Sequence, residues 1–245
     1  MSDYSIFAKH YDTLMGNVNY SHRAEHILKL FKKYDRTPTL MLDLGCGTGG
    51  FTREFAKKGI SMICVEPSID MLSIAKAKDS IGDILYLCQS GQEMDLYGTV
   101  DGVVCCMDTV NHITDKRDLK AVFSKVSLFL EKDRLFIFDV NTLYKQKKIL
   151  GDNTFVYETD FVTCVWQNFY DSKRACTDMK LDFFTLNGEL YEKSTEYITE
   201  RVYSKKELSD MLNNAGLKLE AVLGENSFSP PTKTSQRNIY ITRKI

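Results

Sequence analysis

The sequence predicts an α/β protein with a doubly wound, seven-stranded mixed sheet, an N-terminal helical cap and an inserted antiparallel β lid. Two observations lead to this fold class. From Thr39 to Asn141, short apolar runs alternate with helical segments, which is typical of a parallel sheet covered by helices on both faces. Between residues 154 and 203 the pattern changes to β-rich alternation with little helical periodicity, which indicates antiparallel strands.

The first elements are helical. Residues 4–34 place apolar side chains at helical spacing, and Thr37-Pro38 ends that pattern. We therefore expect a helical cap over residues 1–36.

Beyond the cap, each predicted strand is a short apolar run, and several predicted helices begin or end at a local signal. Ser68 and Ser204 are good N-caps, while Gly59 and Gly216 suit helix ends because glycine adopts positive φ. The predicted strands of the main sheet are 40–44, 61–65, 85–88, 102–107, 135–139, 217–223 and 238–242. The predicted helices are 50–58, 68–78, 118–130 and 204–213.

The inserted region is defined by a hairpin signal. Asn187-Gly188 separates two alternating runs, and both residue types tolerate the positive φ of a tight turn. We therefore divide the chain into the cap, a Rossmann-like domain formed by 37–145 and 204–245, and an inserted antiparallel subdomain over 146–203. Because an insertion at this point follows the fifth strand, it can cover the ligand crevice as a lid.

Composition narrows the functional class. The formal net charge of the 245 residues is −1, whereas a nucleic-acid-binding protein usually carries a basic excess. The apolar runs are far shorter than a membrane span, and the first residues do not resemble a secretory signal. No CxxC occurs among the seven cysteines, and the four histidines lack ligand-like spacing. We expect a cytoplasmic protein with reduced thiols and no bound metal; its oligomeric state stays open.

The segment Leu42-Asp43-Leu44-Gly45-Cys46-Gly47-Thr48-Gly49-Gly50 carries the chemistry. It joins the first strand to the first helix of the sheet, at the crevice where such folds bind ligands. Its glycines permit a tight turn and a close approach of ligand to backbone. They also satisfy GxGxxG, so an NAD-dependent oxidoreductase is one alternative. The carboxylate of Asp43 favours a ligand with positive groups over a pyrophosphate, whereas Glu66, after the second strand, suits the ribose of either nucleoside.

These residues resemble the motifs of a known family. Asp43-Leu-Gly-Cys-Gly-Thr-Gly is similar to the first motif of the class I S-adenosylmethionine-dependent methyltransferases, and Val65-Glu66-Pro67-Ser68 followed by Asp70-Met71-Leu72 is similar to the second. The resemblance covers about residues 4–142 and 204–243. It implies that S-adenosylmethionine is the cofactor, that Glu66 holds the ribose and that Met71 packs on the adenine. The family's usual aspartate after the third strand is replaced by Ser90.

Two further segments resemble a small-molecule-type subgroup of that family. They are Phe7-Ala8-Lys9-His10-Tyr11-Asp12 and Asp108-Thr109-Val110-Asn111-His112. The resemblance implies that Tyr11 closes over the methionine end of the cofactor. The candidate cofactor-binding residues are Tyr11, Asp43, Gly45, Cys46, Gly47, Gly49, Glu66, Pro67, Met71, Ser90, Gly91, Gln92 and Met107. The candidate catalytic residues, which would position or deprotonate the acceptor, are His112, Asn111 and Asp108.

The sequence thus predicts a methyltransferase that uses S-adenosylmethionine and a small-molecule acceptor, methylated at a nitrogen or oxygen atom. Two alternatives remain at this point. One is the NAD-dependent oxidoreductase, and the other is a non-catalytic S-adenosylmethionine-binding partner protein. The sequence does not identify the acceptor.

Overall fold

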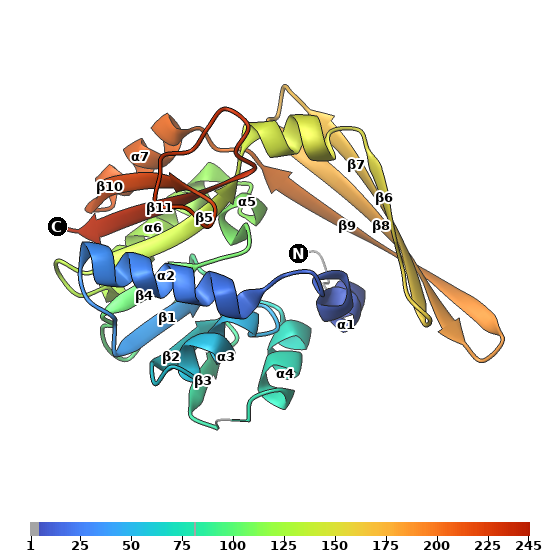
Figure 1. The fold of residues 1–245 in the computed structure, drawn as a ribbon, viewed down its shortest axis with the longest axis horizontal. Coiled ribbons are helices and arrows are strands. Elements are labelled where there is room, and N and C mark those ends of the chain that lie inside the picture. The colour runs from blue at the N-terminus through green and yellow to red at the C-terminus, as the bar shows by residue number, and fades with distance from the viewer. Residues whose placement is uncertain (1–4, 81) are drawn as a thin grey trace.

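The computed structural model describes residues 5–80 and 82–245, and it is built around two sheets (Figure 1). The larger sheet has seven strands in the order β10-β11-β5-β4-β1-β2-β3, with β11 antiparallel to both of its neighbours and β1 to β5 parallel. This order confirms the predicted doubly wound mixed sheet. Its strands are β1 (Leu40–Leu44), β2 (Ser61–Val65), β3 (Ile84–Leu87), β4 (Gly102–Cys105), β5 (Leu135–Asn141), β10 (Leu217–Gly224) and β11 (Arg237–Lys244).

Helices cover both faces of this sheet because its strands send alternate side chains to opposite sides. Leu42 and Val103 belong to a core packed against α6 and α7, whereas Met41 and Val104 belong to a second core packed against α2 and α3. The helices are α1 (Ser5–Leu14), α2 (Tyr20–Tyr34), α3 (Gly50–Ala56), α4 (Ile69–Ala77), α5 (Thr109–His112), α6 (Lys116–Phe129), α7 (Lys205–Asn214) and the π-helix η1 (Lys145–Leu150). Within the described residues, no helix is both long and apolar enough to cross a membrane.

Several element boundaries differ from the sequence-based expectation. The helical stretch expected over residues 4–34 is two helices, because the chain turns before the N-cap Asn19. Tyr4 and the first three residues of the predicted cap lie outside the described part of the chain. The strand expected over 102–107 ends at Cys105, because Met107 and Asp108 have left-handed backbone angles, with φ of 58° and 57°.

The smaller sheet is antiparallel and has the strand order β6-β7-β8-β9. It extends away from the main body in Figure 1, with α1 between the two. The hairpin at its tip is one residue out of the expected register, since Asn187 pairs with Leu190 and the turn residues are Gly188 and Glu189. Of the two, Gly188 has the positive φ, 65°. The strands are β6 (Thr154–Glu158), β7 (Val162–Asp171), β8 (Cys176–Asn187) and β9 (Leu190–Arg201).

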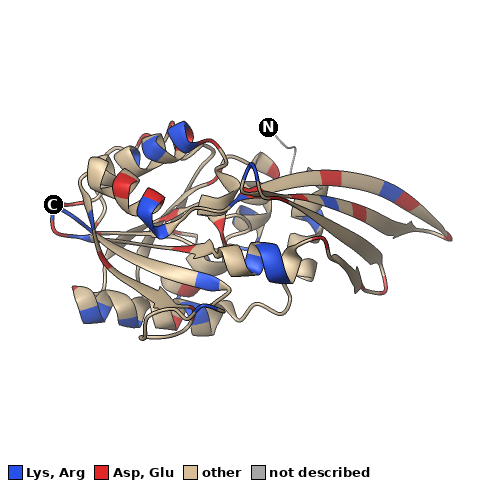
Figure 2. Cartoon of the chain, turned by 90° about the horizontal axis from the view of Figure 1, so that it is seen from above, with Lys and Arg blue, Asp and Glu red and all other residues tan. Residues whose placement is uncertain are grey.

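The two faces of this inserted sheet differ in character. One face is apolar: Leu181, Phe183 and Ile198 pack with Phe7 of α1 and Met71 of α4. The opposite face carries charged residues such as Lys180 and Asp182. Figure 2 marks the Lys, Arg, Asp and Glu positions along these strands by colour. On that face Asp182 accepts a hydrogen bond from Lys180 at 2.8 Å and one from Thr195 at 2.5 Å. The sheet therefore has one face that docks on the N-terminal helix and one that carries charged residues.

Candidate functional site

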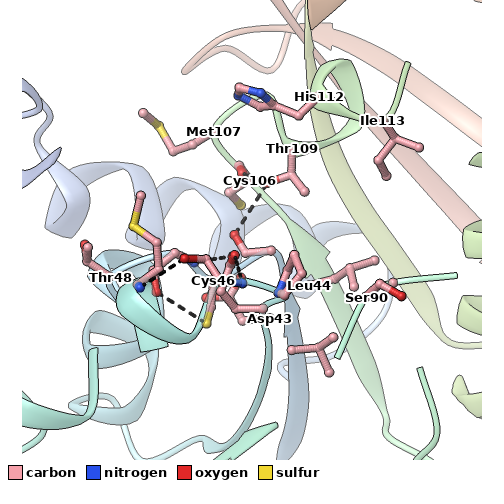
Figure 3. Close-up of a pocket in the computed structure, with 18 of the residues that line it drawn as sticks. Asp43, Leu44, Cys46, Thr48, Ser90, Cys106, Met107, Thr109, His112 and Ile113 are labelled. Carbon is pink, nitrogen blue, oxygen red and sulfur yellow. Dashed lines mark hydrogen bonds between the residues drawn. The ribbon is translucent and has the colours of Figure 1, made fainter. Parts of the chain in front are cut away.

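A cavity of about 840 Å³ opens at the carboxyl ends of β1, β2 and β4. Its walls come from the loops after these strands, from α1 and the start of α2, and from β9 of the inserted sheet. Figure 3 shows Asp43 and Cys46 on one side of the cavity and Met107, Thr109 and His112 on another. All the predicted cofactor residues except Gly49 line this cavity. They are Tyr11, Asp43, Gly45, Cys46, Gly47, Glu66, Pro67, Met71, Ser90, Gly91, Gln92 and Met107.

The glycine loop is shaped by backbone geometry. Gly45 has φ of 74°, and its N–H donates to the carbonyl oxygen of Val65 at 2.7 Å. A Cβ at Gly45 would lie 2.3 Å from Cγ2 of Thr109, so a side chain there would collide with the start of α5. Gly49 has φ of 75° and is the N-cap of α3, outside the cavity lining. It therefore serves the turn into the helix.

Asp43 is the last residue but one of β1, beneath this loop. Its side chain is buried, and its Oδ2 accepts a hydrogen bond from the Thr52 hydroxyl at 2.6 Å. Burial raises the pKa of Asp43 to about 6, and the nearby Glu66 charge adds to this shift, while the Thr52 hydrogen bond opposes it. Asp43 is therefore a buried carboxylate with one hydrogen-bond donor from the protein on Oδ2.

Glu66 follows β2 and is also buried. Its Oε2 accepts from the Gly47 N–H at 3.1 Å and its Oε1 from the Ser68 N–H at 3.0 Å, which fixes the carboxylate at the cavity wall. Burial raises its pKa, while the two backbone hydrogen bonds oppose that shift. Each carboxylate oxygen has capacity for a further hydrogen bond from a ligand.

The two carboxylates fit a cationic nucleoside. Among the described residues, no Lys or Arg forms an ion pair with Asp43 or Glu66. A buried carboxylate without a cationic partner is costly, and a ligand that supplies ammonium and hydroxyl groups relieves that cost. A pyrophosphate would instead add negative charge to this site.

Helix α1 lies over one side of the cavity and is held at both ends. The Glu196 side chain of β9 accepts hydrogen bonds from the N–H groups of Ile6 and Phe7, each at 2.7 Å. Near the other end, Asp12 accepts a hydrogen bond from the Thr48 hydroxyl of the glycine loop at 2.8 Å. The helix thereby connects the inserted sheet to the cofactor loop.

Aromatic side chains extend the cavity beyond the predicted set. Tyr20, the first residue of α2, lines it beside Tyr11, and burial raises the pKa of both hydroxyl groups. From β9, Tyr197 and Thr199 also contribute. Sequence reasoning missed these three because their place at the cavity depends on how α2 and the inserted sheet pack, which no local pattern reveals.

The three catalytic candidates do not lie together at the cavity. His112 lines it, whereas Asp108 and Asn111 are outside its lining. The Asn111 side chain is buried, donating to the carbonyl oxygen of Arg201 at 2.8 Å and accepting from the N–H of Asn141 at 2.8 Å. It therefore ties α5 to β5 and β9.

Asp108 belongs to a buried ionic network. Its Oδ2 lies 3.1 Å from Nη2 of Arg237 and accepts from Nδ2 of Asn141 at 2.6 Å. Burial opposes ionisation of Asp108, but the charges of Arg237 and Lys145 prevail and hold its pKa well below its usual range. Arg237 also donates to Asp139 at 2.6 Å, so this network joins β5, β11 and the residue before α5.

A different carboxylate faces His112. Oε1 of Glu200, on β9, lies 3.9 Å from Nε2 of His112. Glu200 is buried, and its Oε2 accepts hydrogen bonds from Nδ2 of Asn141 at 2.9 Å and from the Gln146 amide. The sequence does hold one signal for Glu200. It lies two residues after Ile198 on the same strand, so both side chains point to the same, buried face of the sheet.

Comparisons with known proteins show the family to which the chain belongs. A family model described as a methyltransferase domain matches residues 41–133. The Bacillus subtilis protein "Putative methyltransferase YqeM" is 30% identical over 243 residues, covering 98% of this chain and 97% of that protein.

Solved structures show the same fold. The crystal structure of a S-adenosylmethionine-dependent methyltransferase from Clostridium acetobutylicum has 30% identity and a TM-score of 0.87, and the match covers 98% of each chain. CalS10 from Micromonospora echinaspora, an amino pentose methyltransferase solved with S-adenosylmethionine bound, shares the fold at 14% identity with a TM-score of 0.78, over 97% of this chain and 96% of that one. The chain belongs to the S-adenosylmethionine-dependent methyltransferases with the class I fold, and S-adenosylmethionine is its cofactor.

Proposed function

We propose that this enzyme methylates a small-molecule acceptor, at a nitrogen or oxygen atom, inside the cavity described above. One observation carries the proposal: the same cavity is lined by the glycine loop and Glu66 on one side and by Tyr197 and Thr199 of the inserted sheet on the other. Cofactor and acceptor can therefore share one enclosed space, as methyl transfer requires. In this proposal residues 146–203 form the acceptor-side lid.

The cofactor side follows from the chemistry of the lining residues. Asp43 would hold the ammonium group of the methionine moiety, and Glu66 would accept hydrogen bonds from the ribose hydroxyls. Met71 and the segment Ser90-Gly91-Gln92 would contact the adenine, and Tyr11 would cover the methionine end. The glycines Gly45 and Gly47 allow the ligand to approach the backbone.

When bound, S-adenosylmethionine supplies an electrophilic methyl group. The protein's own contribution is to orient the acceptor toward that group and to exclude water from it. His112 is the imidazole at the cavity wall, so it is the residue we place beside the acceptor. We assign no contact with the reacting atoms to Asp108 or Asn111, since both are outside the cavity lining.

Titration of the purified protein with S-adenosylhomocysteine and with NAD tests the cofactor site. We expect binding of S-adenosylhomocysteine and a thermal shift worth about 2.7 kcal/mol at a hundredfold excess over the dissociation constant. A shift with NAD and none with S-adenosylhomocysteine would contradict the assignment. Incubation with methyl-labelled S-adenosylmethionine and a small-molecule extract then separates an enzyme from a non-catalytic binding protein, because the enzyme alone transfers the label.

A further inference from the structure

The charged residues of the cavity have one sign. Its described lining residues include five carboxylates and no Lys or Arg. The carboxylates are Asp43, Glu66, Asp70, Asp115 and Asp118. Asp115 is partly neutralised, since it pairs with Arg117 at 2.6 Å, and Arg53 contacts the Thr48 carbonyl oxygen from outside the described lining. Asp43 and Glu66 are assigned to the cofactor, so Asp70, Asp115 and Asp118 are the carboxylates left to act on the acceptor, and they disfavour a carboxylate or phosphate group there.

Aromatic rings surround the same space. Phe7 and Tyr11 of α1, Tyr20 of α2 and Tyr197 of β9 all line it. The ring centroids of Phe7 and Tyr11 are 5.3 Å apart in an edge-to-face arrangement. The faces of aromatic rings carry partial negative charge and attract ammonium groups. Rings and carboxylates together favour a positively charged guest.

A proton acceptor stands at the cavity wall. His112 faces the Glu200 carboxylate across 3.9 Å, and a neutral imidazole has one ring nitrogen that can accept a proton. The charges of Asp108 and Glu66 also act on His112, while Lys145 and Arg237 offset the charge of Asp108. Glu200 is rigidly placed, because Asn141 and Gln146 hold its other oxygen.

We propose, on the basis of the methyltransferase function above, that the acceptor is a small primary or secondary amine that enters as an ammonium ion, and that His112, positioned by Glu200, accepts its proton. An ammonium nitrogen has no lone pair, so it cannot react until a proton leaves. The pairing of an imidazole with a buried carboxylate stabilises the imidazolium that forms when the proton arrives.

The proposed step balances. The ammonium group gives one proton to the His112 imidazole, which frees the lone pair on the acceptor nitrogen. That lone pair forms the new bond to the methyl carbon, while the carbon–sulfur bond breaks and its electron pair stays on sulfur. The methylated nitrogen carries the positive charge that sulfur has lost, and the imidazolium returns its proton to water.

The acceptor class is tested with a small-molecule extract and methyl-labelled S-adenosylmethionine. The extract is separated by ion exchange, and a portion of the cation-exchange fraction is N-acetylated in water to block its amines. We expect label in the untreated cation-exchange fraction and at least a tenfold loss after acetylation. Label in the anionic or neutral fraction, or label that survives acetylation, would overturn the amine proposal. Absence of label from every fraction would instead contradict the proposed function itself.

The roles of His112 and Glu200 are tested with the amine fraction as the probe. We expect His112→Asn and Glu200→Gln to lower the labelling rate at neutral pH, His112→Asn by at least tenfold, given that a positioned general base contributes roughly a hundredfold or more. Both variants should recover toward the wild-type rate at about pH 9.5, where amines begin to lose their proton to water.

Glu192→Gln is the matched control, because Glu192 is an exposed carboxylate on the same strand. Binding of S-adenosylhomocysteine should be unchanged in all three variants, which separates a proton-transfer defect from damage to the cofactor site. An unchanged rate in His112→Asn, or a loss that persists at high pH, would overturn the assignment of the proton acceptor. If Glu200→Gln has the same labelling rate as the control Glu192→Gln, Glu200 does not position His112.

Discussion

The two sheets of this enzyme bury their side chains in different ways. The seven-stranded sheet is covered on both faces, so that β5 is buried along its whole length. The four-stranded sheet is covered on one face and carries charged side chains, such as Lys180 and Asp182, on the other. The first sheet supplies the cofactor loop through backbone geometry, and the second supplies side chains from its edge strand β9. In the proposed function, cofactor binding therefore depends mainly on the seven-stranded sheet, while the acceptor side depends on the smaller core, in which Met71 and Tyr11 also pack.

Replacing a large buried side chain in the core of the inserted sheet by alanine should cause the largest loss of stability. Phe183 is fully buried and stacks on His10 of α1, with ring centroids 5.2 Å apart. Phe183→Ala should cost roughly 3–5 kcal/mol because it removes a large buried ring. Hydrogen exchange should show this loss in β7 to β9, while the affinity for S-adenosylhomocysteine changes less than tenfold.

Phe136→Ala is the matched control, since Phe136 is equally buried but lies in the main sheet. Phe136→Ala should lower the protection from hydrogen exchange in the inserted sheet and also the affinity for S-adenosylhomocysteine. If Phe183→Ala stays folded and yet abolishes S-adenosylhomocysteine binding, the two regions are not separable and the comparison fails.

Removal of the proposed ribose contact should affect the other region. Glu66→Ala deletes a charged acceptor that we place against two hydroxyl groups, each hydrogen bond being worth about 1.5–3 kcal/mol. Calorimetry should show at least a tenfold rise in the dissociation constant of S-adenosylhomocysteine, with exchange in the inserted sheet unchanged. Glu25→Ala, at an exposed carboxylate of α2, serves as control. If Glu66→Ala binds S-adenosylhomocysteine with wild-type affinity, the role of Glu66 is structural only.

The cofactor site should also respond to pH. Burial raises the pKa of Asp43 to about 6, so the carboxylate is protonated below that pH and loses the charge that we place beside the ligand's ammonium group. The affinity for S-adenosylhomocysteine should fall by up to about tenfold per pH unit below 6. Calorimetry across this range checks it, and Asp43→Asn should bind weakly with a flatter pH dependence. If the affinity of Asp43→Asn falls as steeply with pH as that of the wild type, the group that takes up the proton is not Asp43.

The unliganded protein should show the opposite trend. Because the folded chain favours protonated Asp43, this group adds stability below about pH 4, the usual range of an aspartate in the unfolded chain. That contribution is lost as the pH rises through the folded value near 6.

The smallest effect is expected at the tip of the inserted sheet. Gly188 has φ of 65°, and a Cβ there would meet no atom within 4 Å. Gly188→Ala should therefore cost about 1 kcal/mol, through backbone strain alone. Exchange in the β8–β9 hairpin measures this, and S-adenosylhomocysteine binding should not change. A larger loss would show that the tip makes contacts beyond its own turn.

The same contrast explains how far the sequence could be interpreted. Asp43 and the glycines lie in one short segment whose spacing is tied to a strand–turn–helix unit, so the family and the cofactor followed from that segment and Glu66. Tyr20 and Glu200 reach the site only through tertiary packing. Strand alternation around Ile198 marks Glu200 as a buried position, but no local pattern places either residue at the cavity.

Asp108 and Asn111 illustrate the opposite case. Both residues come shortly after β4, whose carboxyl end borders the crevice. Their partners Arg237 and Asn141 lie on β11 and β5 and hold them in structural contacts instead. A polar residue near a crevice is satisfied by whichever partner folding places beside it, and the sequence does not reveal that partner.

The capping of α1 by Glu196 bears on any attempt to exchange acceptor specificity between relatives. Glu196 holds the N–H groups of Ile6 and Phe7, which lie at the far end of the chain from β9. A chimaera that received residues 146–203 from another enzyme would keep a first helix fitted to the original sheet. A graft should therefore carry residues 5–14 together with the inserted sheet, and it should keep the hydrogen bond from Thr48 of the cofactor loop to Asp12.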